Sequence, residues 1–238
     1  MTHFRYFINK IKMKTGNHKL DNPVWYSVSE THKDFGIDFG TIKFYHPDYC
    51  PFGGFIALDN MEQSISEYAK LASNFFIIGQ KPNVPDSLKL NNELICLQMI
   101  IHSKIEGEIE DQIVKLEEEH LDDLLGLVKI VYPEYFKKKT SSLGNYYGIY
   151  KNNQLVAVTG ERMQMDEYTE VSAVITHPEH TGKGYAKQLV THTVNAILAK
   201  NKTPFLHVAE SNVGAIKLYE KLGFETRAKI SVWNIIQK

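Results

Sequence analysis

Residues 177–186 read His-Pro-Glu-His-Thr-Gly-Lys-Gly-Tyr-Ala and lie between a short apolar segment and a long amphipathic one. Upstream, residues 171–176 are rich in β-branched side chains, which is typical of a half-buried strand. Downstream, apolar residues recur at helical spacing as far as Leu198. Gly182 and Gly184 lack a Cβ, so loop N–H groups can approach a ligand. The sequence predicts an anion site at the start of this helix, where unpaired N–H groups meet the positive end of the dipole.

Taken alone, the same loop is also compatible with a solvent-exposed turn that carries a lysine. A second unit favours the anion site. Residues 205–209 predict another strand, Ser211 or Asn212 is a natural N-cap for the next helix, and Gly223 is a natural stop. The apolar face of that helix comprises Ala215, Ile216, Tyr219 and Leu222.

These two units resemble the GNAT (GCN5-related N-acetyltransferase) superfamily, and the chain from about Ile109 to Lys238 resembles its FR47-like branch. Two motifs carry the resemblance: Thr181-Gly-Lys-Gly-Tyr-Ala186, which corresponds to the family's Arg/Gln-x-x-Gly-x-Gly/Ala, and Asn212-x-x-Ala215-x-x-x-Tyr219-x-x-x-Gly223-Phe224. Thr181 stands where the family usually has Arg or Gln, so one side chain that could donate a hydrogen bond to the pyrophosphate is different. The main-chain groups of the loop do not depend on that side chain.

The resemblance implies an α/β (α+β) fold with a mixed, mostly antiparallel central sheet and helices on both sides, over residues 106–238. A smaller α/β domain over residues 1–105 would form a wall of the substrate cleft. Its sequence predicts a strand or hairpin at 36–45, a turn at 51–55 into a strand at 55–58, a helix at 61–71, and strands at 74–79 and within 89–102. Residues 106–123 are acidic; they either attract a cationic amine or form a solvated face of a strand at 112–116 and the helix after it.

The resemblance further implies an acyl-CoA-dependent N-acyltransferase that moves acetyl from acetyl-CoA to a primary amine by direct attack in a ternary complex. The expected acceptor is a small amine or an amino-acid-like molecule. The expected CoA-binding residues are Val174, Ile175, Thr176, Thr181, Gly182, Lys183, Gly184, Tyr185, Ala186, Asn212 and Ala215. The rival interpretation is a catalytically idle CoA-binding or regulatory module. A P-loop is excluded because Lys183 lies between the glycines and Tyr185 follows them.

Two residues are predicted to be catalytic, Tyr219 and Glu170. A phenol with a pKa of about 10 stays protonated at neutral pH and can give its proton to the CoA thiolate; the alternative for Tyr219 is core packing. The N–H of Val174 is the expected oxyanion donor. Glu170 is the predicted general base, with Glu161 as its competitor, although water can also carry the proton and each carboxylate can also be an ordinary surface group.

Composition excludes several classes of function. The chain has 27 basic and 28 acidic residues and a formal net charge of −1, which indicates neither a nucleic acid nor an anionic membrane as partner. Cys50 and Cys96 lack CxxC spacing, and the histidines lack metal-ligand spacing, so no metal is expected. Residues 1–20 lack the apolar core of a signal peptide, and a reducing compartment suits the two cysteines, so a cytoplasmic location is expected. A monomer or homodimer is also expected.

Overall fold

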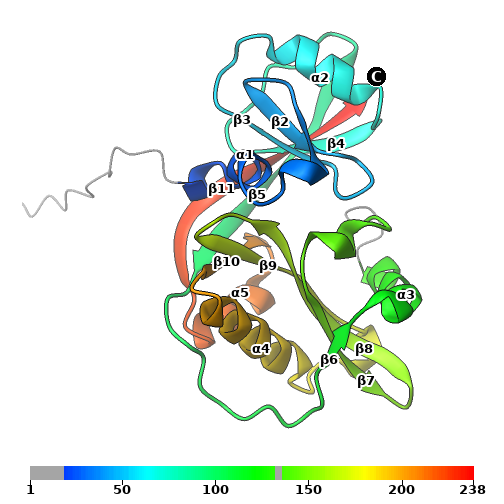
Figure 1. Cartoon of the computed structure of the whole chain (residues 1–238), viewed down its shortest axis with the longest axis vertical. Helices are drawn as coiled ribbons and strands as arrows, with labels where there is room; N and C mark the ends of the chain where they lie inside the picture. Colours follow the sequence, from blue (N-terminus) through cyan, green and yellow to red (C-terminus); the bar gives the residue numbers. More distant parts are fainter. Residues whose placement is uncertain (1–18, 132–135) are drawn as a thin grey trace, which may run out of the picture.

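The computed structural model describes residues 19–131 and 136–238, so the expectation about residues 1–20 lies almost wholly outside the described part. Figure 1 shows the arrangement of the elements. The strands are β1 (Gly36–Asp38), β2 (Ile42–Tyr45), β3 (Phe52–Phe55), β4 (Asn74–Ile78), β5 (Leu88–Ile100), β6 (Val114–Leu116), β7 (Tyr146–Lys151), β8 (Gln154–Gln164), β9 (Tyr168–Thr176), β10 (Thr203–Ala209) and β11 (Glu225–Gln237). The α-helices are α1 (Pro23–Ser29), α2 (Met61–Ala69), α3 (Leu121–Val131), α4 (Tyr185–Ala199) and α5 (Val213–Lys221).

All these strands join one sheet in the order β1-β2-β3-β4-β11-β5-β10-β9-β8-β7-β6. Neighbouring strands are antiparallel except at two places, β3 beside β4 and β9 beside β10. The mixed, mostly antiparallel sheet confirms the predicted fold class.

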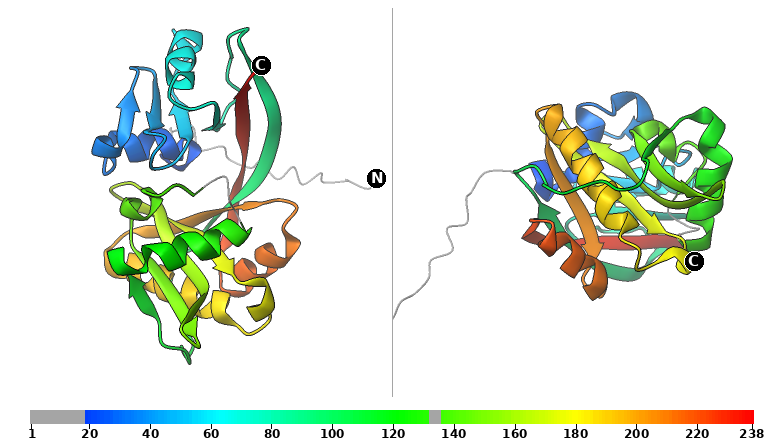
Figure 2. Two further views of the ribbon diagram at one scale, coloured as in Figure 1. Left: turned by 90° about the vertical axis from the view of Figure 1, so that its right-hand side faces the viewer. Right: turned by 90° about the horizontal axis from the view of Figure 1, so that it is seen from below.

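Two long strands connect the upper part of the molecule in Figure 1, which contains β2–β4, with the lower part, which contains β6–β10. β5 and β11 each have 13 residues and pair along nearly their whole length, and Figure 2 shows them running side by side between the two parts. β4 pairs with the second half of β11, whereas β10 pairs with the end of β5. β5 therefore lies between β10 and β11, two strands of the C-terminal part. The domain boundary at residue 105 stays a prediction, and the hydrogen bonds of the sheet run across it.

Helices cover opposite faces of the lower sheet. Tyr146 of β7 packs with α3, whereas the next residue, Tyr147, packs with Leu189 of α4. This alternation is what the two-residue period of a strand dictates. A further apolar cluster contains residues from both parts of the chain, among them Phe52 of β3 and Phe205 of β10. The two parts therefore share a core. In the described part of the chain, no helix combines the length and apolarity that crossing a membrane requires.

One predicted element of the N-terminal part is wrong. The strand is not residues 55–58 but β3, which includes the Gly-Gly pair taken as a turn. β3 is hydrogen-bonded to strands on both sides and all four of its residues are buried. A Cβ on Gly53 would lie 2.3 Å from the Phe44 ring, so the glycine is needed for close packing inside the sheet and not for a turn.

Candidate active site

A cleft opens where two parallel strands separate. β9 and β10 pair from Thr203 to Phe205, and their described pairing ends with Phe205 opposite Glu170. Both strands continue beyond this point, β9 along β8 and β10 along β5. The cleft between them holds about 260 Å³ and is lined by residues 171–175 and 207–209. Separated edges leave backbone N–H and C=O groups that an extended ligand can pair with, as an added strand would.

β9 contains a bulge at the cleft. Opposite it, β8 advances two residues from Val158 to Gly160, whereas β9 advances three, from Ile175 to Ser172. Ala173 takes up the extra residue with φ +50°, an uncommon conformation for a side chain with a Cβ. Bulges change where the neighbouring backbone groups point. This bulge immediately precedes Val174, the predicted oxyanion donor, which lines the cleft.

The glycine loop lies at the start of α4, as predicted. Gly182 and Gly184 have φ +77° and +79°, and a Cβ built on either would meet nothing within 4 Å. α4 begins after Gly184 without a side-chain cap. The first-turn N–H groups therefore lie beside open space at the positive end of a 15-residue helix, which suits a phosphate group. Thr181 does not contribute to the helix cap, since its hydroxyl donates to Pro178 O at 3.1 Å.

The remaining predicted CoA-binding residues differ in their exposure to solvent. Lys183 is exposed, whereas Tyr185 is buried and its ring belongs to the apolar cluster beneath α4. Ile175 is buried and lines the cleft, and Thr176 and Ala186 are half-buried.

The start of α5 forms the other wall of the cleft. The Asn212 side chain caps the helix, accepting a hydrogen bond from Ala215 N at 3.1 Å. Asn212, Ala215 and Tyr219 all line the cleft, one helical turn or so apart. Tyr219 is only 6% exposed and belongs to the apolar cluster beneath the helix. Its position fits both interpretations, the catalytic one and core packing.

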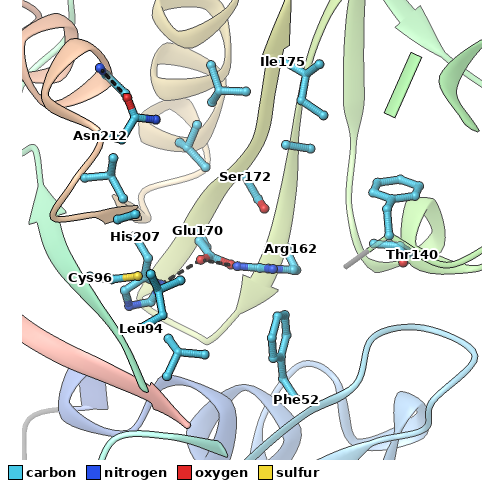
Figure 3. Close-up of a pocket in the computed structure, with 18 of the residues that line it drawn as sticks. Phe52, Leu94, Cys96, Thr140, Arg162, Glu170, Ser172, Ile175, His207 and Asn212 are labelled. Atoms are coloured by element: carbon cyan, nitrogen blue, oxygen red, sulfur yellow. Dashed lines mark hydrogen bonds and ion pairs between the residues drawn. The ribbon is translucent and has the colours of Figure 1, made fainter. Parts of the chain in front are cut away.

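Glu170 lies at the base of the cleft between two basic side chains. Figure 3 shows Arg162 on one side of it and His207 on the other. Arg162 donates through Nε and Nη2, each at 2.8 Å, and the His207 Nδ1 lies 2.8 Å away. The Gln98 amide, which donates to Leu20 O, also lies 3.0 Å from His207 Nε2. This arrangement makes Nε2 the acceptor, so Nδ1–H donates to Glu170.

These partners set the basicity of Glu170. Burial alone would raise the pKa of the carboxyl, but the charge and hydrogen bonds of Arg162, together with His207, hold the pKa at about 2. A carboxylate this weakly basic takes a proton from an ammonium group poorly. The base assignment stays a prediction, and these surroundings weigh against it. Its competitor Glu161 does not line the cleft; it is buried elsewhere and bonded to Lys200 at 2.9 Å.

Two residues at the cleft were missed by sequence reasoning. Arg162 lines it with its guanidinium 4.7 Å from the Phe52 ring, and Tyr146 lines it with a buried hydroxyl. The sequence signal that could have revealed Arg162 is its position opposite Glu170 across the short turn between β8 and β9, where opposite charges can pair. Among the described residues, no three His, Cys, Asp or Glu side chains are grouped so as to hold a metal ion.

Comparisons with known proteins find a matching family pattern and similar folds. Residues 146–233 match the family model of the FR47-like proteins. A crystal structure of a GNAT-family protein from Novosphingobium aromaticivorans has 28% sequence identity and a TM-score of 0.86, covering 93% of this chain and 100% of that one. No curated protein matches the sequence.

Two more distant structures share the fold alone. A GCN5-related N-acetyltransferase from Kribbella flavida has 10% identity and a TM-score of 0.60, covering 88% of this chain and 93% of that one. A GCN5-related N-acetyltransferase-like protein from Streptococcus suis has 13% identity and a TM-score of 0.61, covering 91% and 92%. The predicted resemblance is confirmed: the chain has the GNAT acetyltransferase fold, and its residues 146–233 carry the FR47-like pattern.

Proposed function

We propose that the protein is an acetyl-CoA-dependent N-acetyltransferase that acts on a small primary amine. The observation that carries this proposal is the separation of β9 from β10 after the Phe205–Glu170 pair, with a lined cleft in the gap. The proposal requires a groove for the extended pantetheine arm and an anion site beside that groove. The cleft would be the groove, and the open glycine loop between β9 and α4 would be the anion site.

The chain's own groups can hold such a molecule. Backbone N–H groups of residues 182–186 would bind the pyrophosphate of CoA. The facing edges of β9 and β10 would bind the pantetheine arm through main-chain hydrogen bonds, and Asn212 lies at the same cleft. Bound acetyl-CoA would supply an activated thioester.

The cleft also carries groups suited to the reaction. Beside the bulge, the N–H of Val174 would stabilise the negative charge that develops on the carbonyl oxygen. Tyr219, on the opposite wall, would give its phenolic proton to the leaving thiolate. With Glu170 bonded to Arg162 and His207, we assign the loss of the ammonium proton to water, and Glu170 to holding Arg162 and His207 in place.

The rival function is a CoA-binding module without catalysis, which the weak basicity of Glu170 favours. The deciding experiment incubates the full chain with acetyl-CoA and a panel of small primary amines, and follows CoA release together with the mass of the amine. Our proposal predicts free CoA and an amine heavier by one acetyl group, in equal amounts. Tight acetyl-CoA binding with no acetylated amine across the panel would favour the idle module instead.

A further inference from the structure

Tyr146 has a buried hydroxyl at the wall of the cleft. The residue is 2% exposed, and the oxygen has no hydrogen-bond partner among the described residues. Burying a hydroxyl without a partner costs free energy. Most buried polar groups in proteins are satisfied, so an exception in the wall of a ligand cleft points to a group on the ligand.

Strand register directs the Tyr146 ring toward the centre of the cleft. Tyr146 is paired with Gly160, and Gly160 with Ser172 of β9. Directly paired residues of antiparallel strands have the same face, so Tyr146 and Ser172 project to one side. A Cβ on Gly160 would lie 2.3–2.6 Å from three atoms of the Tyr146 ring. The ring therefore lies across β8, where only glycine leaves room, and its hydroxyl is carried from β7 toward β9.

That direction leads to the reacting end of the cleft. Adjacent strands are about 4.8 Å apart, a spacing that the length of a tyrosine side chain exceeds. Ser172 directly precedes the bulge at Ala173, and Val174 follows. The phenol thus extends toward the segment that carries the proposed oxyanion donor, on the face where Arg162 and Glu170 also lie.

The walls around this hydroxyl are mostly apolar. Phe52, Val128 and Phe136 line the same cleft, and the Phe136 ring packs against the Tyr146 ring edge-to-face at 5.6 Å. The charged side chains that line it in the described part of the chain, Arg162 and Glu170, are bonded to each other. A ligand here gains by burying apolar surface and meets the unpartnered Tyr146 hydroxyl.

We propose that the Tyr146 hydroxyl accepts a hydrogen bond from the acceptor amine, and that the acceptor is a primary monoamine with an apolar body. This inference rests on the proposed function and names its substrate class. Burial raises the pKa of the Tyr146 phenol above its ordinary value, so the group stays neutral. It therefore orients the amine and does not take its proton.

The test is calorimetric titration of 2-phenylethylamine into the full chain saturated with CoA. Tyr146→Phe should bind the amine about tenfold more weakly than the parent, because one hydrogen bond is lost. Tyr147→Phe is the matched control, since its ring packs beneath α4 on the other face; its affinity should equal the parent's. The melting temperature of Tyr146→Phe should not fall, because the hydroxyl has no partner within the described fold.

Three results would overturn the inference: no binding of 2-phenylethylamine to the parent, equal affinity in Tyr146→Phe, or tighter binding of 1,4-diaminobutane than of the aryl amine. The proposed function is tested separately by adding acetyl-CoA and weighing the amine. Tyr146-dependent binding without acetylation would contradict acetyl transfer and leave the binding site intact. Acetylation at the parent rate by Tyr146→Phe would keep the transferase and overturn the role of Tyr146.

Discussion

Arg162 of β8 and Glu170 of β9 form a bidentate ion pair at the base of the cleft, with both hydrogen bonds 2.8 Å long. The Glu170 side chain is 1% exposed and that of Arg162 is 16% exposed. Paired guanidinium and carboxylate groups of this geometry compensate each other's loss of water, whereas either one alone would be a buried charge. The pair therefore holds together the two strands that form one side of the cleft.

Replacing Glu170 should damage stability more than catalysis. We expect Glu170→Gln to lower the free energy of unfolding by about 3 kcal/mol, because it leaves the Arg162 charge buried without its partner. Glu161→Gln is the control, since its partner Lys200 is 44% exposed and can turn to water, so its loss should be smaller. Denaturant unfolding measures both. An unchanged stability of Glu170→Gln with a hundredfold lower turnover would restore Glu170 as the general base.

The Arg162–Glu170 pair should make the stability of the fold depend on pH in the acid range. The pKa of Glu170 in the folded chain is about 2, below its ordinary value of 4.5, so the unfolded chain binds this proton first. The stability that the pair contributes is therefore present above about pH 4.5 and is lost as pH falls toward 2. Unfolding curves over this range should show the parent approaching Glu170→Gln. A constant difference in stability down to pH 2 would contradict the lowered pKa.

The bulge in β9 stores strain that glycine would release. Ala173 has φ +50°, a left-handed conformation that costs a residue with a Cβ about 1 kcal/mol or more. We expect Ala173→Gly to raise the melting temperature by a few degrees. Ala157→Gly, in the neighbouring strand without positive φ, should lower it. A less stable Ala173→Gly would mean that the bulge is not strained.

The sequence predicted the local parts of the site and missed the long-range ones. The loop around Gly184 and the Asn212 cap depend on neighbouring residues, so glycine and cap positions were sufficient to find them. The placement of β5 between β10 and β11 depends on pairing between residues more than a hundred positions apart, which local patterns do not encode. A chain starting near Ser103 would lack this central strand.

The cleft residues missed by sequence reasoning have the same explanation. Arg162 and Tyr146 occur in ordinary strand patterns, and their roles come from register: Arg162 reaches Glu170 across β8 and β9, and Tyr146 lies over Gly160. The bulge at Ala173 is invisible in the sequence because alanine does not signal positive φ.

Removing one hydroxyl from α5 tests the proton donor. Tyr219→Phe keeps the ring and its packing in the apolar cluster, so the melting temperature and acetyl-CoA affinity should stay close to the parent's. Loss of a positioned general acid should lower kcat by about a hundredfold to ten-thousandfold. Steady-state kinetics with an acetylated amine as the readout measures this. Parent-like kcat in Tyr219→Phe would return Tyr219 to a packing role.

The central claim is that the loop before α4 binds the pyrophosphate of CoA, and calorimetric titration with acetyl-CoA tests it most directly. Gly184→Val puts a side chain into the open space beside the α4 N–H groups, whereas Gly40→Val is a matched control, with φ +84° against +79° and equally open surroundings. Both variants carry similar backbone strain. We predict parent-like affinity for Gly40→Val and no measurable binding for Gly184→Val. Equal affinity in Gly184→Val and the parent would contradict the account.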